Sequence, residues 1–148
     1  MRFDGSIDVP APPERVWLAM LDVPSIATCV PGIESLQDVG GGAYVGVATT
    51  RLGPIAARFD LKGALMPDEA SRTARVAVQG RERLTGTRVE ATFEAKVRAV
   101  DAESAIDYTL DISLLGRLGQ MGQAVFQDVA RSITDRTAAC LRERLAGG

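Results

Sequence analysis

The chain has 148 residues, 46% of them hydrophobic and 24% charged, with a net charge of −2; this composition is typical of a globular domain and excludes a disordered or fibrous protein. The basic residues are 15 arginines and two lysines, and they are scattered, so the basic stripe required for nucleic-acid binding is missing. No apolar run reaches the ~18 residues of a membrane span and no signal peptide is present, so we expect one cytoplasmic domain over residues 1–148.

Histidine is absent, which excludes Ser-His-Asp and Cys-His catalysis and histidine-ligated metals. A hydrolase would need carboxylates or the two lysines instead. Cys29 and Cys140 lie far apart in sequence, and neither has a CxxC partner. We therefore expect two buried free thiols, not a disulfide or a metal site.

The N-terminal part predicts one strand and two short helices. Apolar and polar residues alternate over 2–9, and a proline-rich stretch ends this strand. Pro13 can open a helix that runs to Leu21, with Trp17 on its inward face. Asp22 can cap one further turn or two, and Val30-Pro31-Gly32 predicts a sharp turn.

From residue 33 the apolar period changes from 3.6 to 2, which predicts antiparallel strands. Gly40-Gly41-Gly42 predicts a hairpin turn between the first two of them. The strands are expected over residues 33–39, 43–51, 55–65, 74–80, 88–98 and 106–114. The charged stretch Arg81-Glu82-Arg83 is interpreted as a solvent-facing hairpin.

The last third predicts a long amphipathic helix from Leu114 to Leu145, with Gly116, Gly119 and Gly122 near its start. Strands and helices occupy separate blocks of the sequence, which favours an α+β fold with a curved antiparallel sheet around this helix.

Small residues on the inward faces of the strands allow two interpretations. They can let the helix approach the sheet closely in a solid core, or they can leave an apolar cavity. Periodicity alone leaves both open. Polar groups for such a cavity could come from Tyr108, Thr49 and Cys29.

Three stretches carry a resemblance to a known family. They are VPAP through Val16-Trp17 to CVPGIESL at 29–36, LGPIAARF at 52–59, and GRLGQMG at 116–122. In combination they resemble the family of the carbon monoxide dehydrogenase G protein, an accessory component of that enzyme system and a branch of the START-like (SRPBCC, helix-grip) superfamily.

The resemblance implies a helix-grip fold: a seven-stranded curved antiparallel sheet around a long C-terminal helix, two short helices after the first strand, and a deep hydrophobic cavity. It implies a non-catalytic accessory protein of a molybdenum hydroxylase of the carbon monoxide dehydrogenase type. Such a protein would bind a quinone (menaquinone or ubiquinone) or a lipid, with no covalent cofactor, and would recruit the enzyme to the inner face of the membrane or pass electrons to quinone. Longer members carry a membrane-binding tail beyond the helix; this chain ends at Gly148, so we expect at most peripheral membrane association.

With this fold, the cavity is expected to be lined by Trp17, Ile26, Val30, Ile33, Phe59, Leu61, Phe93, Tyr108, Leu110, Leu118, Met121, Val125 and Phe126. Two alternatives remain. One is a cyclase- or hydratase-like enzyme of the same superfamily acting on an aromatic or polyketide substrate, which would require Tyr108 or a buried carboxyl with a raised pKa as acid or base. The other is a partner-binding domain with a filled core.

Overall fold

The computed structural model describes residues 1–146. In chain order the elements are β1 (Arg2–Val9), α1 (Pro13–Leu21), α2 (Val23–Ala27), β2 (Ile33–Gly40), β3 (Ala43–Leu52), β4 (Ile55–Asp68), β5 (Thr73–Glu82), β6 (Arg88–Val100), β7 (Glu103–Leu115), the 3-10 turn η1 (Arg117–Gln120) and α3 (Gln123–Ala146). The expected α+β class, with seven strands and a long C-terminal helix, is confirmed. None of the helices in this range is long and apolar enough to cross a bilayer.

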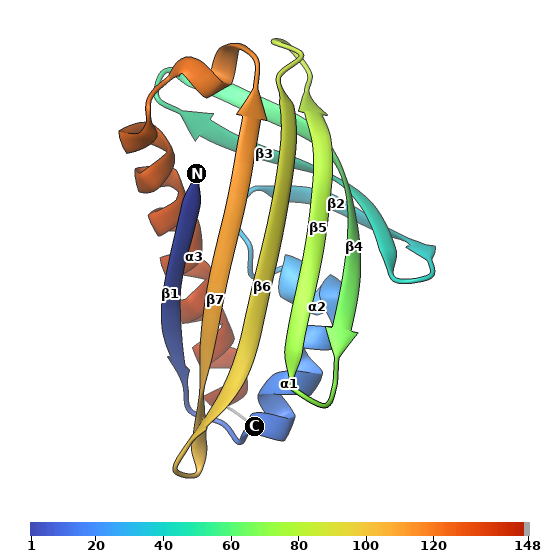
Figure 1. Cartoon of the computed structure of the whole chain (residues 1–148), viewed down its shortest axis with the longest axis vertical. Helices are drawn as coiled ribbons and strands as arrows, with labels where there is room; N and C mark the ends of the chain where they lie inside the picture. Colours follow the sequence, from blue (N-terminus) through green and yellow to red (C-terminus); the bar gives the residue numbers. More distant parts are fainter. Residues whose placement is uncertain (147–148) are drawn as a thin grey trace.

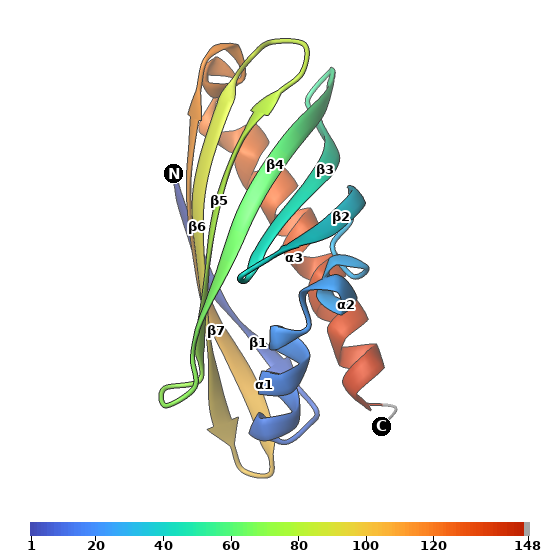
Figure 2. The same cartoon turned by 90° about the vertical axis from the view of Figure 1, so that its right-hand side faces the viewer.

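All seven strands form one antiparallel sheet in the order β1-β7-β6-β5-β4-β3-β2. Strands β2 to β7 are a meander, in which each strand pairs with the next, and β1 completes the sheet beside β7, with Phe3 opposite Leu110. Figures 1 and 2 show that the sheet is curved and that α1, α2 and α3 lie on its concave side. Sheet and helices therefore form two layers with the interior between them.

Two glycines allow the sheet to bend. Gly46 on β3 and Gly80 on β5 pair with Leu61 of β4 from opposite sides. A Cβ atom on Gly46 would overlap the carbonyl oxygen of Ser35, and one on Gly80 would overlap that of Asp60. Because any side chain here would push neighbouring strands apart, the glycines permit the curvature that makes the inner face concave.

The two short helices begin as the sequence predicts. Pro13 is the first residue of α1, where its missing N–H would have had no helical partner. The helix buries Val16 and Trp17 against the sheet. The carboxylate of Asp22 accepts a hydrogen bond from the Ser25 N–H at 3.3 Å and so caps α2.

The segment before α3 differs from the expected continuous helix over 114–145. β7 extends into this range, a single 3-10 turn follows, and α3 begins only after Gly122. Gly116 has a φ of 137° and Gly122 a φ of 93°, positive values that an α-helix does not contain. The glycines thus divide the segment into strand, turn and helix, and Leu118 and Met121 lie outside α3.

The two cysteines are joined. Cys29, just after α2, and Cys140, towards the C-terminal end of α3, form a disulfide across 111 residues of sequence, with their Cα atoms 5.5 Å apart. The prediction of two free thiols is therefore wrong. Sequence separation hid the pairing, because the fold brings α2 and α3 together on the same side of the sheet (Figure 2).

Candidate functional site

The interior contains two packed clusters of buried side chains. The first, here the α1 cluster, includes Trp17 of α1 and Ile106 of β7. The second, here the η1 cluster, includes Leu118 of η1 and Phe126 of α3. Each of these four side chains is less than a tenth exposed. The two clusters hold the helices on the sheet at two separate places.

Between the clusters, the concave face of the sheet is not filled. Phe93 lies there, opposite Val76 on one neighbouring strand and Leu110 on the other, yet it is 36% exposed. Val76, Val78 and Leu110 are only half-buried. Central residues of a close-packed interior would be fully buried, so this part of the inner face is open.

A cavity of about 200 Å³ lies in this open part, between α2 and strands β2 to β5. Residues 23–33 form its cover, with Val23, Ile26, Ala27, Val30 and Ile33 facing it. The sheet forms the opposite wall, in which Gly63 and the side chains beside it leave the space. The cavity therefore lies under α2 and the loop after it, and α3 contributes no lining residue.

The lining is apolar apart from two hydroxyl groups, those of Ser35 and Tyr44. None of the described lining residues is charged. Within residues 1–146, no three Cys, Asp or Glu side chains lie close enough together to hold a metal ion. The cavity can therefore accept an uncharged apolar molecule with a hydrogen-bonding oxygen, because burying an unpaired charge would be strongly unfavourable.

The structure distributes the expected lining residues over three places. The cavity itself is lined by Ile26, Val30, Ile33 and Leu61. Trp17 belongs to the α1 cluster, and its buried indole N–H has no hydrogen-bond partner among the described residues. The η1 cluster and its margin contain Phe59, Leu118, Met121, Val125 and Phe126. Phe93, Tyr108 and Leu110 lie on β6 and β7, where the rings of Phe93 and Tyr108 stack with centroids 6.1 Å apart.

The polar groups named from the sequence do not line the cavity. Cys29 is in the disulfide, the Thr49 hydroxyl lies 3.5 Å from the Gly32 carbonyl oxygen, and Tyr108 lies over Gly5 of β1. Sequence reasoning missed Tyr44. Strand alternation places Tyr44 on the inner face, but alternation does not reveal how far α2 reaches across the sheet.

Glu82, expected in a solvent-facing hairpin, is instead only 1% exposed. Its carboxylate accepts hydrogen bonds from the N–H groups of Arg58, Leu84 and Thr85 and from the Thr85 hydroxyl, at 2.7–3.1 Å. Burial alone would raise the pKa of Glu82, but these bonds outweigh it and lower the pKa to about 2. The Thr85 hydroxyl also bonds to that of Thr87.

Thr87 carries this network on to the start of the C-terminal segment. The Thr87 hydroxyl accepts a hydrogen bond from the Leu118 N–H at 3.2 Å, so the β5–β6 hairpin fixes η1. Glu82 is thus a structural carboxylate outside the cavity, and it stays ionised at neutral pH. It is not the buried acid with a raised pKa that a cyclase or hydratase mechanism would require.

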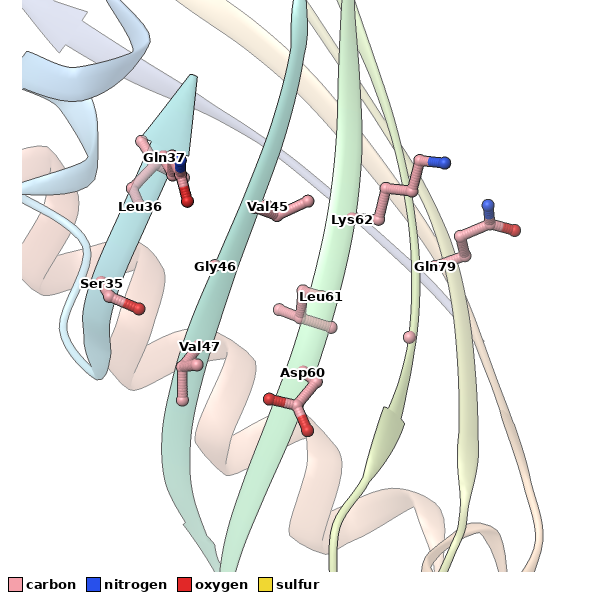
Figure 3. Close-up of a pocket in the computed structure, with 11 residues that line it drawn as sticks. Ser35, Leu36, Gln37, Val45, Gly46, Val47, Asp60, Leu61, Lys62 and Gln79 are labelled. Carbon is pink, nitrogen blue, oxygen red and sulfur yellow. The ribbon is translucent and has the colours of Figure 1, made fainter. Parts of the chain in front are cut away.

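A second hollow, of about 570 Å³, is open to solvent (Figure 3). Strands β2 to β5 border it, and Lys62 and Gln79 extend along it from neighbouring strands. Their row in the sheet, opposite Val45, alternates with the inward row of Leu61. Most of this hollow therefore lies over the outer face, where polar side chains suit contact with water.

Comparison with known proteins identifies the family. The family model CoxG, described as the G component of carbon monoxide dehydrogenase, matches residues 5–146. No curated protein sequence matches the chain.

Solved structures agree on the fold. A conserved protein from Geobacillus kaustophilus has a TM-score of 0.88 and 18% identity, covering 99% of this chain and 96% of that chain. A START superfamily protein from Mycobacterium smegmatis has a TM-score of 0.72 and 10% identity, with coverage of 99% and 97%. The Zhui aromatase/cyclase from Streptomyces sp. R1128 has a TM-score of 0.61 and 16% identity, with coverage of 99% and 92%. At such identities the likeness shows the START-like fold alone.

Proposed function

The chain belongs to the carbon monoxide dehydrogenase CoxG family, and we propose that it is a non-catalytic carrier of an uncharged apolar ligand, a quinone or a neutral lipid. It would serve a molybdenum hydroxylase of the carbon monoxide dehydrogenase type as an accessory protein. Family membership supports a ligand-binding accessory role in general. The quinone and the partner enzyme belong to the proposal.

The observation that carries this proposal is the apolar cavity under α2. Its volume of about 200 Å³ exceeds the ~150 Å³ of an engineered apolar cavity that binds benzene. A single ring with small substituents therefore fits inside. A longer apolar tail would follow the open inner face past Phe93, which is 36% exposed there.

The chemistry of the lining narrows the ligand class. Ser35 and Tyr44 supply hydroxyl groups, and a hydroxyl can donate a hydrogen bond to a carbonyl oxygen. A quinone ring presents carbonyl oxygens on an uncharged apolar body. A fatty acid would bury a carboxylate without a cationic partner, so it is a poorer match.

The cyclase- or hydratase-like alternative has less support. The cavity contains no carboxyl group among the residues described, and the buried carboxylate, Glu82, has a lowered pKa. The likeness to the Streptomyces aromatase/cyclase extends to the fold and not to a catalytic group.

A displacement assay tests the proposal. The neutral fluorophore N-phenyl-1-naphthylamine is bound first, and a short-tailed menaquinone analogue is then titrated as competitor. Val78 faces the cavity and its neighbour Ala77 is exposed, so Val78→Phe and Ala77→Phe are a matched pair. We expect Val78→Phe to weaken binding at least tenfold and Ala77→Phe to leave it unchanged. Absence of saturable binding, or equal affinity in both variants, would overturn the proposal.

A further inference from the structure

The cover of the cavity is a single short stretch of chain, residues 23–33. Its backbone hydrogen bonds are local: the Ile26 N–H donates to Asp22, the Cys29 N–H to Ile26 and the Val30 N–H to Ala27, at 2.8–3.2 Å. Among the described residues, no backbone hydrogen bond joins residues 23–31 to a strand or to α3. The cover can therefore move as one unit.

Both ends of this cover are anchored. At its start, Asp22 separates α1 from α2 and caps α2. At its end, Gly32 has a φ of 93°, and its carbonyl oxygen accepts a hydrogen bond from the Thr49 N–H of β3 at 2.8 Å. These two points are natural hinges, because the chain changes direction at each of them.

Between the hinges, α3 holds the cover at two places. The first is the disulfide between Cys29 and Cys140. The second is Arg144, whose guanidinium donates to the Ser25 carbonyl oxygen at 2.7 Å and to the Thr28 hydroxyl. Cys29 is next to Val30, which lines the cavity. The covalent link therefore acts directly on the cavity wall.

We propose that the Cys29–Cys140 disulfide is a redox-controlled latch on the ligand cavity. This inference rests on the proposed carrier function and adds its regulation. In the oxidised protein the cover is fastened to α3, and a bound guest leaves slowly. In the reduced protein only the polar contacts of Arg144 hold the cover, and the guest exchanges faster.

The chemistry of the switch is thiol–disulfide exchange with a dithiol. One thiolate of the dithiol attacks a sulfur of the Cys29–Cys140 pair and forms a mixed disulfide. The second thiolate then attacks this mixed disulfide and leaves as the oxidised dithiol. Cys29 and Cys140 become two thiols, having gained two electrons and two protons, and the dithiol has lost the same.

Stopped-flow release of N-phenyl-1-naphthylamine tests the latch in the wild-type chain, before and after treatment with dithiothreitol. Titration of free thiols in denaturant should count none before treatment and two after it. We expect release to be at least ten times faster after reduction. The double variant Cys29→Ser/Cys140→Ser should release the probe at the reduced rate whether or not dithiothreitol is present.

Hydrogen exchange separates a local latch from general loosening. After reduction, amides of residues 23–31 should exchange faster, while those at the centre of β6 and β7 should be unchanged. Equal release rates in both redox states, or equally faster exchange throughout the sheet, would overturn the latch. Saturable binding with equal release rates would leave the carrier function intact, whereas no binding in either state would overturn both.

Discussion

Glu82→Gln tests whether a buried carboxylate holds the β5–β6 hairpin and η1 in place. The carboxylate receives four hydrogen bonds and gives none. Glutamine has the same shape, but its NH₂ group would face the Arg58 N–H or the donors of Leu84 and Thr85. Two donors facing each other in a buried place leave both unsatisfied.

The magnitude follows from the pKa of Glu82, about 2 in the folded protein against an ordinary value of 4.5. Since folding lowers this pKa, the ionised carboxylate stabilises the fold above pH 4.5, and this stabilisation is lost as the pH falls towards 2. A difference of one in pKa corresponds to ~1.4 kcal/mol. Linkage therefore gives a contribution of about 3 kcal/mol at pH 7 that falls to about 1.4 kcal/mol at pH 3.

Urea denaturation followed by circular dichroism at pH 7 and pH 3 measures both numbers. We expect Glu82→Gln to lower the free energy of unfolding by about 3 kcal/mol at pH 7, and this gap to shrink by about 2 kcal/mol at pH 3. Glu90→Gln, a surface change on the next strand, should alter it by less than ~1 kcal/mol. A Glu82→Gln gap below ~1 kcal/mol at pH 7, or one that does not change with pH, would refute the reasoning.

Three further predictions concern stability. Reduction of the Cys29–Cys140 disulfide should lower the free energy of unfolding by roughly 2–4 kcal/mol, and urea curves with and without dithiothreitol measure this; coincident curves would mean that the disulfide does not stabilise the fold. Gly32→Ala should destabilise by roughly 1–3 kcal/mol because its φ is 93°, so a thermal melt identical to wild type would contradict that backbone assignment. Phe59→Ala should destabilise by about 3–5 kcal/mol and Phe93→Ala by clearly less, because Phe59 is 8% and Phe93 36% exposed; equal losses in denaturant melts would show that the inner face is filled.

The strands and short helices could be predicted because their signals are local. An antiparallel strand with one face towards the interior alternates apolar and polar residues, as in 88–98, and the structure has β6 there. Pro13 and Asp22 mark helix starts by chemistry that depends only on neighbouring residues. Such features need no knowledge of the rest of the chain.

The C-terminal segment is harder to predict because its glycine spacing allows two interpretations. Gly116, Gly119 and Gly122 occur at a spacing compatible with a helix. Only the backbone reveals that Gly116 and Gly122 have positive φ. The expected helix therefore begins too early, and Leu118 is placed in the wrong element.

The features missed at the site are tertiary. The disulfide joins Cys29 to Cys140 across 111 residues, and no spacing rule reaches that far. Glu82 resembles a surface residue in a charged stretch, and its burial depends on amides that the hairpin turns towards it. Tyr44 could be placed on the inner face, but the position of α2 above it could not.

The strand order also has a consequence for synthesis on the ribosome. Strands β2 to β7 can pair one after another as they emerge, because each lies beside its predecessor. β1 is made first yet pairs only with β7, where Ile7 lies opposite Ile106. The first strand of the nascent chain must therefore wait, with one apolar face uncovered, until almost the whole protein has been translated.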